Sequence, residues 1–420
     1  MRNNPLHTIA FLNTFDKKNH LNLTLLQLQH ITLERQGLIH TSPFGTGKEA
    51  VLNTMERLGY LQIDTLSIVE RAHHHTLWTR LPDYTPAYLE ALVEERRVFE
   101  YWFHAASYLP MRDYRFALPQ MLDVKHNASH YYNATPEGMQ YVLDTIRAEG
   151  PKRARDFESK TLKPGSWWNW KPTKWALERL FMQGDLMVSG RKGMEKAYDL
   201  RERVLPEGID LTVPSALEYA EYLVHTYLRA YGFTTVKQIT HLKKGAVLRK
   251  NVDAVLDAML EEGLVQKVAV EGMPPVFMEI GLMEKSIGVG DAAIRFLSPF
   301  DNSVIHRDRL QQLFGFDYKI ECYVPKEKRQ YGYFCLPILF GTAFLGRMDC
   351  KAHRKEKRLE VIHLHIEKEQ LPIESWLTPF VASLKLFATF NGCSTVQLTQ
   401  VSPEKFSGVL KGAMEGFGDR

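Results

Sequence analysis

The sequence predicts an α+β protein with three tandem winged-helix modules, a C-terminal antiparallel β domain and a closing helix. Two observations carry this prediction. A pattern of helix, glycine and strand recurs three times, and short strand-like runs follow it near the C-terminus. The predicted parts are a lead-in (1–23), the three modules (24–125, 130–208 and 209–285) and the β domain with its helix (290–420).

The repeated pattern places apolar residues seven and four positions before a glycine, and another two positions after it. Its copies are V-L-N-T-M-E-R-L-G-Y-L (51–61), A-L-E-R-L-F-M-Q-G-D-L (176–186) and V-L-D-A-M-L-E-E-G-L-V (255–265). Helical spacing that ends in a glycine and continues into an apolar run is typical of a helix, a left-handed cap and a strand.

Each copy is expected to follow an earlier helix, at Leu25–Arg35, Met139–Ile146 and Leu217–Leu228. A β-hairpin is expected after the second copy, with its turn at Gly190–Gly193, and after the third, over 265–280. Helices followed by a hairpin form a winged helix, a variant of the helix-turn-helix. The alternative is an α+β domain whose glycine-capped helices match by chance.

After Arg295 the sequence pattern changes from helical spacing to short strand-like runs. Strand-like runs are expected at Tyr318–Val324, Tyr331–Leu339, Ala343–Asp349 and Leu359–His365, with turns between them. They predict a small antiparallel sheet or barrel. Trp376–Phe390 is expected to be the helix that closes it.

Composition narrows the class of protein. The chain has 420 residues, a formal net charge of +4 and no apolar run of about 18 residues, so no transmembrane helix is expected. Its N-terminus lacks the pattern of a signal peptide, which favours a cytoplasmic protein. None of the four cysteines (Cys322, Cys335, Cys350 and Cys393) forms a C-x-x-C pair, so we expect buried free thiols, no metal and no cofactor.

Basic residues gather in two stretches. Residues 147–179 hold nine Lys or Arg against four Asp or Glu, and residues 351–358 hold five against one. Local basic patches on a nearly neutral chain suit duplex DNA held at one face, although a solvated surface explains a single patch equally well.

Several motifs that suggest other chemistry fail on inspection. F-G-T-G-K-E (44–49) lacks the first glycine and the final hydroxyl of a phosphate-binding loop, and is better interpreted as the entry to a helix. His73, His74 and His75, if on a strand, cannot all face one metal ion, which favours contacts with phosphate or sugar. W-W-N-W (167–170) could stack bases but more often forms core.

The remaining candidate is Leu61-Gln62-Ile63-Asp64. On a strand, Gln62 and Asp64 share one face, directly after the first module's expected recognition helix. An exposed polar edge is the plainer explanation of this spacing. The histidine-rich and aromatic segments at 71–81 and 99–110 favour a functional site.

Four stretches in order resemble the YcaQ/AlkZ winged-helix DNA glycosylases over nearly the whole chain. They are L-G-Y-L-Q-I-D-T-L-S-I-V-E-R-A-H-H-H-T-L-W-T-R-L (58–81), F-E-Y-W-F-H-A-A (99–106), L-S-P-F-D-N (297–302) and Y-G-Y-F-C-L-P-I-L (331–339). The family signature is Gln, an aliphatic residue, then Gln or Asp. Gln62-Ile63-Asp64 matches the Asp-bearing branch, which resembles YcaQ.

The resemblance implies a monofunctional DNA glycosylase that releases N7-alkylated purines and unhooks interstrand crosslinks, with Gln62 and Asp64 as catalytic residues. No lysine lies beside this pair in sequence, so a Schiff-base step is not expected. Expected DNA contacts, from charge and position, are His73, His74, His75, His104, Lys174, Arg347 and Lys351.

Two other functions remain open from the sequence. A winged-helix transcription regulator would bind DNA without catalysis, and so would a scaffold that only holds damaged DNA. The partner in every case is double-stranded DNA. A DNA-binding protein of the cytoplasm is expected to associate with the nucleoid. The chain is expected to be a monomer, because it has neither a heptad repeat nor an exposed apolar stripe.

Overall fold

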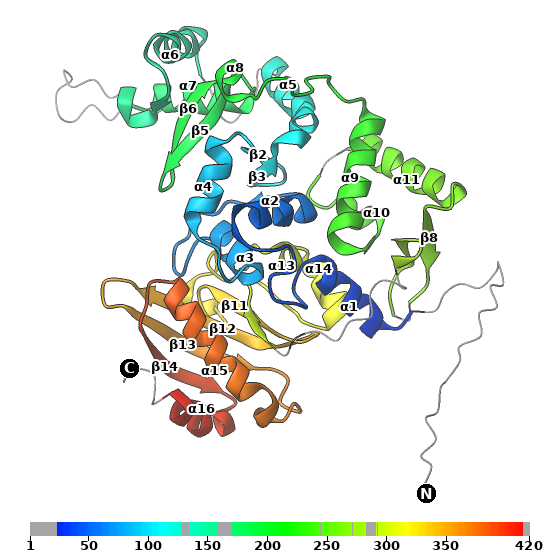
Figure 1. Ribbon diagram of the computed structural model, residues 1–420, viewed down its shortest axis with the longest axis vertical. Helices are drawn as coiled ribbons and strands as arrows, with labels where there is room; N and C mark the ends of the chain where they lie inside the picture. The colour runs from blue at the N-terminus through cyan, green and yellow to red at the C-terminus, as the bar shows by residue number, and fades with distance from the viewer. Residues whose placement is uncertain are drawn as a thin grey trace, which may run out of the picture.

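A computed structural model describes residues 23–127, 134–157, 170–243, 245–270, 272–282, 291 and 293–414. The fold is mixed α+β, with three small three-stranded sheets and one five-stranded sheet (Figure 1). Residues 1–22 of the expected lead-in (1–23) and residues 167–169 of W-W-N-W lie outside the described residues. No described helix is long and apolar enough to cross a membrane.

The first small sheet has the order β1-β3-β2 and lies among the helices of the N-terminal part. This part contains α1 (Leu25–Arg35), α2 (Gly47–Leu58), β1 (Leu61–Gln62), α3 (Ala72–Arg80), α4 (Pro86–Glu94), β2 (Val98–Trp102), β3 (Ala106–Pro110), a 3₁₀ turn (Met111–Ala117) and α5 (Leu118–His126). The motif at 44–49 is the entry to α2, as predicted.

The helix α1 has the predicted bounds but packs outside the first module. It lies against α9 (Ala216–Tyr231) and α14 (Arg307–Phe314). Thr32 Oγ1 donates to the Tyr231 carbonyl at 3.0 Å, and Gln36 Nε2 donates to the Ala230 carbonyl at 2.6 Å. The helix α1 therefore packs into the same hydrophobic core as the strands of the third small sheet.

The second small sheet has the order β4-β6-β5. This part contains α6 (Pro136–Glu149), β4 (Lys152–Arg153), a 3₁₀ turn (Ala154–Phe157), α7 (Trp170–Met182), β5 (Leu186–Lys192), β6 (Glu195–Leu200) and α8 (Arg201–Val204). The predicted hairpin is present, and its turn lies at Gly193-Met194 because β5 continues through a bulge near Gly190.

The third small sheet has the order β7-β9-β8. This part contains α9, β7 (Phe233–Thr234), α10 (Val236–Ile239), α11 (Ala246–Glu261), β8 (Val265–Val268) and β9 (Val276–Glu279). Gly59, Gly184 and Gly263 follow α2, α7 and α11 with φ angles of +83°, +79° and +69°. The predicted sequence of helix, left-handed glycine and strand is thus present in all three copies.

The fourth sheet has the order β10-β11-β12-β13-β14 and is covered by one long helix (Figure 1). This part contains β10 (Ile294–Phe296), α13 (Asn302–Ile305), α14, a 3₁₀ turn (Lys326–Lys328), β11 (Cys335–Phe340), β12 (Ala343–His353), β13 (Arg358–Ile366), α15 (Ile373–Phe390), β14 (Thr395–Ser402), a 3₁₀ turn (Glu404–Phe406) and α16 (Ser407–Met414).

Two predictions about this region need correction. Tyr318–Val324 is not a strand; it belongs to the loop before β11. The sheet is also not wholly antiparallel, because β14 pairs parallel to β13. The helix α15 carries the chain back across the sheet, as a parallel pair requires.

The five-stranded sheet is joined to the N-terminal part by the segment after β1. The Ala352 amide donates to the Ile68 carbonyl at 2.9 Å, and Val69 and Ala72 enter the core under β11 to β13. Arg80, the last residue of α3, forms an ion pair with Asp301 at 2.7 Å, and both side chains are 0% exposed. This junction fixes the end of β1 against the C-terminal sheet.

Candidate active site

Gln62 and Asp64 lie where β1 ends. The left-handed Gly59 turns the chain out of α2, and Gln62 then pairs with Ser107 of β3. The Ile63 amide continues the pairing, donating to the Ala106 carbonyl at 2.8 Å. Asp64 Oδ1 then accepts the Leu66 amide at 2.8 Å, which turns the chain away from the sheet.

The Gln62 side chain is buried and held by His104, from the loop between β2 and β3. His104 Nε2 lies 3.1 Å from Gln62 Oε1. Burial, and after it the charges of Lys243 and His241, lower the pKa of His104 to about 4. The imidazole is therefore neutral near pH 7, and because an amide oxygen only accepts, Nε2 must carry the proton. This leaves the Gln62 amide NH₂ to face another partner.

Asp64 is half-buried, and its surroundings make it a stronger base than a free aspartate. Burial raises its pKa, and the backbone amides of Leu66 and Thr65 offset part of that rise. A raised pKa increases the affinity of a carboxylate for a proton, which suits a group that accepts one from water.

An aromatic cluster fixes the loop that carries His104. The rings of Tyr60 and Phe103 stack with centroids 4.7 Å apart, and Tyr60 meets His104 edge-on at 4.9 Å. The loop therefore packs on the residue that follows the Gly59 cap.

Lys243 is a component of this region that the sequence analysis missed. Its Nζ lies 3.9 Å from the centre of the Phe103 ring, 3.3 Å from the Phe103 carbonyl oxygen and 3.5 Å from the Tyr219 hydroxyl. Burial lowers its pKa to about 8. The fold brings it from beyond α10 to β2 and β3, and no local sequence signal reveals that approach.

The three consecutive histidines lie on the helix α3, so the expectation of a strand was wrong. His75 is 1% exposed, and its Nε2 bonds the Phe296 carbonyl at 2.8 Å. His73 is also buried, and His74 Nδ1 lies 2.6 Å from the Tyr84 hydroxyl. His73 and His74 line a cavity of about 490 Å³ between α4 and β5. Burial leaves His75 no surface for a DNA contact.

The three predicted cationic contacts differ in exposure. Lys174 on α7 and Lys351 on β12 are exposed. Arg347 is 1% exposed, with its Nε 2.6 Å from Glu367 and its Nη2 2.7 Å from the Asp317 carbonyl. The expected phosphate contact of Arg347 is therefore wrong, because its guanidinium is used inside the C-terminal part.

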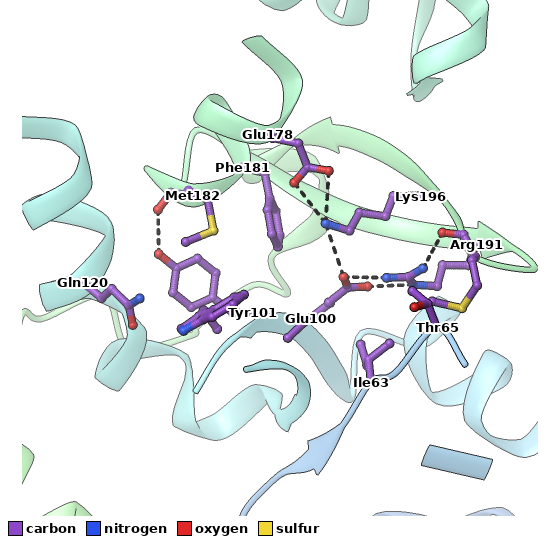
Figure 2. A pocket seen from close by; sticks show the side chains of 13 residues that line it. Ile63, Thr65, Glu100, Tyr101, Gln120, Glu178, Phe181, Met182, Arg191 and Lys196 are labelled. Carbon is purple, nitrogen blue, oxygen red and sulfur yellow. Dashed lines mark hydrogen bonds and ion pairs between the residues drawn. The ribbon is translucent and has the colours of Figure 1, made fainter. Parts of the chain in front are cut away.

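A cavity of about 610 Å³ lies behind β1, between the first and second sheets (Figure 2). Ile63 and Thr65 line it, whereas Gln62 and Asp64 do not. Figure 2 shows Arg191 against Glu100, at 2.7 Å, and Lys196 between Glu100 and Glu178. These ion pairs connect the first sheet to the second. Because Glu100 and Glu178 are both paired with cations, neither is a free carboxylate for catalysis.

The cysteines and acidic groups show no metal chemistry within the described part of the chain. All four cysteines are free, and Cys322 is partly exposed while the other three are buried, which corrects the expectation that all four are buried. Among the described residues, no three His, Cys, Asp or Glu side chains are placed to hold a metal ion.

Two comparisons with known proteins, one of sequence and one of fold, bear on this chain. The model of the family described as DNA glycosylase AlkZ-like matches residues 55–379. The fold is similar to that of the Streptomyces sahachiroi DNA glycosylase AlkZ, with a TM-score of 0.59 and 16% identity over 90% of this chain and 100% of that chain. The family match includes Gln62, Asp64 and His104 and spans most of the sequence, and the protein therefore belongs to the AlkZ-like DNA glycosylase family.

Proposed function

We propose that this DNA glycosylase hydrolyses the N-glycosidic bond of N7-alkylated purines and unhooks interstrand crosslinks joined through them, as the Asp-bearing branch of the family does. The proposal depends on two observations at neighbouring residues. Gln62 is hydrogen-bonded to the neutral His104, and Asp64, two residues after Gln62, has a raised pKa. Gln62 and Asp64 are the proposed catalytic residues.

The substrate determines which groups are needed. An N7-alkylated guanine already carries a positive charge, so it can leave without an enzymatic acid. As the bond to the base breaks, positive charge develops on the sugar and a water must attack it. A carboxylate stabilises that charge and accepts the proton of the water. Asp64 has both roles in this proposal.

The orientation of Gln62 supplies the second requirement. Because His104 occupies the amide oxygen, the Gln62 NH₂ donates to the oxygen of the attacking water, whose proton goes to Asp64. The water is then held between a donor and an acceptor, which orients its lone pair toward the sugar carbon.

A crosslinked base cannot swing into an enclosed pocket, because it remains tied to the other strand. We therefore propose that the base is met within the groove and does not enter the cavity of Figure 2, which Gln62 and Asp64 do not line. Lys174 and Lys351, which are exposed, are proposed to neutralise phosphates.

The three small sheets and their helices support the proposed division into three winged-helix modules that together hold the duplex. In this arrangement each glycine-capped helix, α2, α7 or α11, is followed by the hairpin of its own module, although α3 and α4 intervene in the first. We propose that the protein acts as a monomer.

The proposal is tested with two duplexes, one carrying an N7-guanine crosslink of the nitrogen-mustard type and one carrying a single N7-methylguanine. After incubation with the protein, alkali converts abasic sites into strand breaks. We expect breaks at the alkylated guanine in both duplexes and none in an unmodified control. Release from the single adduct alone would contradict crosslink unhooking, and release from neither would contradict the proposed substrate class.

A further inference from the structure

The loop between α14 and β11 presents an aromatic side chain to solvent. Tyr323 is 77% exposed, more than any other large apolar side chain among the described residues. It lies beside Cys322, in a stretch that the sequence analysis took for a strand.

The loop that carries Tyr323 is held in one conformation. The Glu321 carboxylate accepts the amides of Gln330, Tyr331 and Gly332 at 2.8, 2.8 and 3.1 Å, which ties the two ends of the loop together. Arg329 Nε donates to the Val324 carbonyl at 2.8 Å, across the loop. The exposed ring is therefore placed in advance, and a ligand that meets it need not order the loop.

This loop lies next to the catalytic aspartate. Ile320 and Tyr333, at the two ends of the loop, pack on the same hydrophobic core as Leu66, which is two residues after Asp64. The charge of Asp64 also reaches the loop: after burial and the neighbouring Cys322, it raises the pKa of Tyr323. Tyr323 is thus within electrostatic reach of Asp64, which is itself half-buried.

The tip of the loop carries charge suited to DNA. Lys326 and Lys328 lie in the exposed 3₁₀ turn that follows Pro325, with Glu327 between them, so the turn carries a net charge of +1. Proteins hold unstacked bases with an aromatic ring and nearby basic side chains, because the ring covers a base and the cations meet phosphates.

We propose that Tyr323 stacks on a base next to the alkylated purine, while Lys326 and Lys328 contact the phosphates beside it. Stacking there would compensate for the base stacking lost when the duplex opens around the adduct. The proposal rests on the proposed function, since it gives this loop the task of holding the duplex at Asp64.

The first test measures binding apart from catalysis. In an Asp64→Asn background, Tyr323→Ala is expected to weaken binding of a duplex with N7-methylguanine by roughly 5- to 100-fold, the range for one stacked base. Tyr323→Phe keeps the ring and is expected to bind like its parent. Binding of an unmodified duplex should change little. Tyr141→Ala is the control, because Tyr141 on α6 is another exposed tyrosine, at 58%.

The second test locates the loop on DNA through Cys322, the partly exposed one of the four cysteines. A nucleotide next to the N7-methylguanine carries an alkyl thiol capped as a mixed disulfide. The Cys322 thiolate should displace the cap and form a protein–DNA disulfide. The bond should be absent in Cys322→Ser and with the tether one helical turn away.

The outcomes separate the two proposals. Equal binding by the Tyr323→Ala and parent proteins, or equal trapping at both tether positions, would overturn the role of Tyr323 whether or not the wild type releases the base. Base release is measured on the wild type alone, so its failure would overturn the proposed function and would leave the binding and trapping results to decide the placement of the loop.

Discussion

At the scale of single residues, the protonation of His104 decides how Gln62 is presented. Burial keeps the pKa of His104 near 4, so the ring is a neutral donor and the Gln62 amide is fixed with its NH₂ free. A charged imidazole would also donate, but it would place a cation beside the sugar on which positive charge develops. In the proposed mechanism, the low pKa of His104 avoids this added charge.

Lys243 leads to a prediction about the kind of glycosylase. A buried lysine with a pKa of about 8 is reactive enough to form a Schiff base with an abasic sugar, but its Nζ is directed at the Phe103 ring and carbonyl. We expect borohydride treatment during turnover to trap no covalent protein–DNA complex. A trapped complex that is lost in Lys243→Gln would contradict monofunctional chemistry.

The residues of the candidate site were predictable from sequence to different degrees. Gln62 and Asp64 stand together in the chain, so their pairing is a local pattern. The contact of His104 with Gln62 depends on the register of β1 against β3, and that of Lys243 on the packing of the third part against the first. Arg347 was misjudged because a buried, paired arginine looks like a surface arginine in a sequence.

At the scale of elements, the glycine that ends each repeated helix has a local and a packing role. All three adopt the left-handed conformation, yet only some are crowded. A Cβ on Gly59 would lie 2.3 Å from Thr226 Cγ2 of α9, whereas one on Gly263 would meet nothing within 4 Å. The close approach of α2 and α9 therefore depends on Gly59.

This contrast predicts different costs for the same substitution. Gly59→Ala and Gly263→Ala share the backbone strain of about 1–2 kcal/mol. Gly59→Ala should lose a further ~1–3 kcal/mol of unfolding free energy through overpacking. Urea denaturation of both variants measures the difference. Equal losses would mean that α9 moves freely and that the close packing is not tight.

Elements with local signals were predicted well and the others were not. The structure confirms the capped helices and two of the hairpins. These elements were predictable because their spacing and turn residues are consecutive in the sequence. The hairpin β2–β3 was not identified, since it is separated from α2 by α3 and α4. The parallel strand β14 was missed because its partner β13 lies beyond a crossover helix, and no local pattern reports such a pairing.

At the scale of the whole molecule, one buried ion pair joins the part that bears the proposed catalytic residues to the C-terminal part. Arg80 of α3 binds Asp301 at 2.7 and 3.0 Å and also donates to the Gln36 carbonyl. Burial alone would raise the pKa of Asp301, but the charge and hydrogen bonds of Arg80 lower it instead. The carboxylate therefore remains ionised inside the protein.

Removing the arginine should be costly. Arg80→Met leaves a buried charge without its partner, and we expect a loss of roughly 3–5 kcal/mol in unfolding free energy. Arg97→Met is the matched control, because the pair of Arg97 with Glu49 is 43% and 61% exposed and is worth about 1 kcal/mol or less. Similar losses for both variants would show that the junction does not depend on this pair.

The central claim is tested most directly by Asp64→Asn, which keeps the shape of the side chain and removes its charge and basicity. The measurement is single-turnover release of N7-methylguanine, together with the affinity for the same duplex. We expect release to fall by roughly 10²- to 10⁴-fold, the range for a positioned base, with affinity nearly unchanged. Release at the wild-type rate would contradict the placement of catalysis at Gln62 and Asp64.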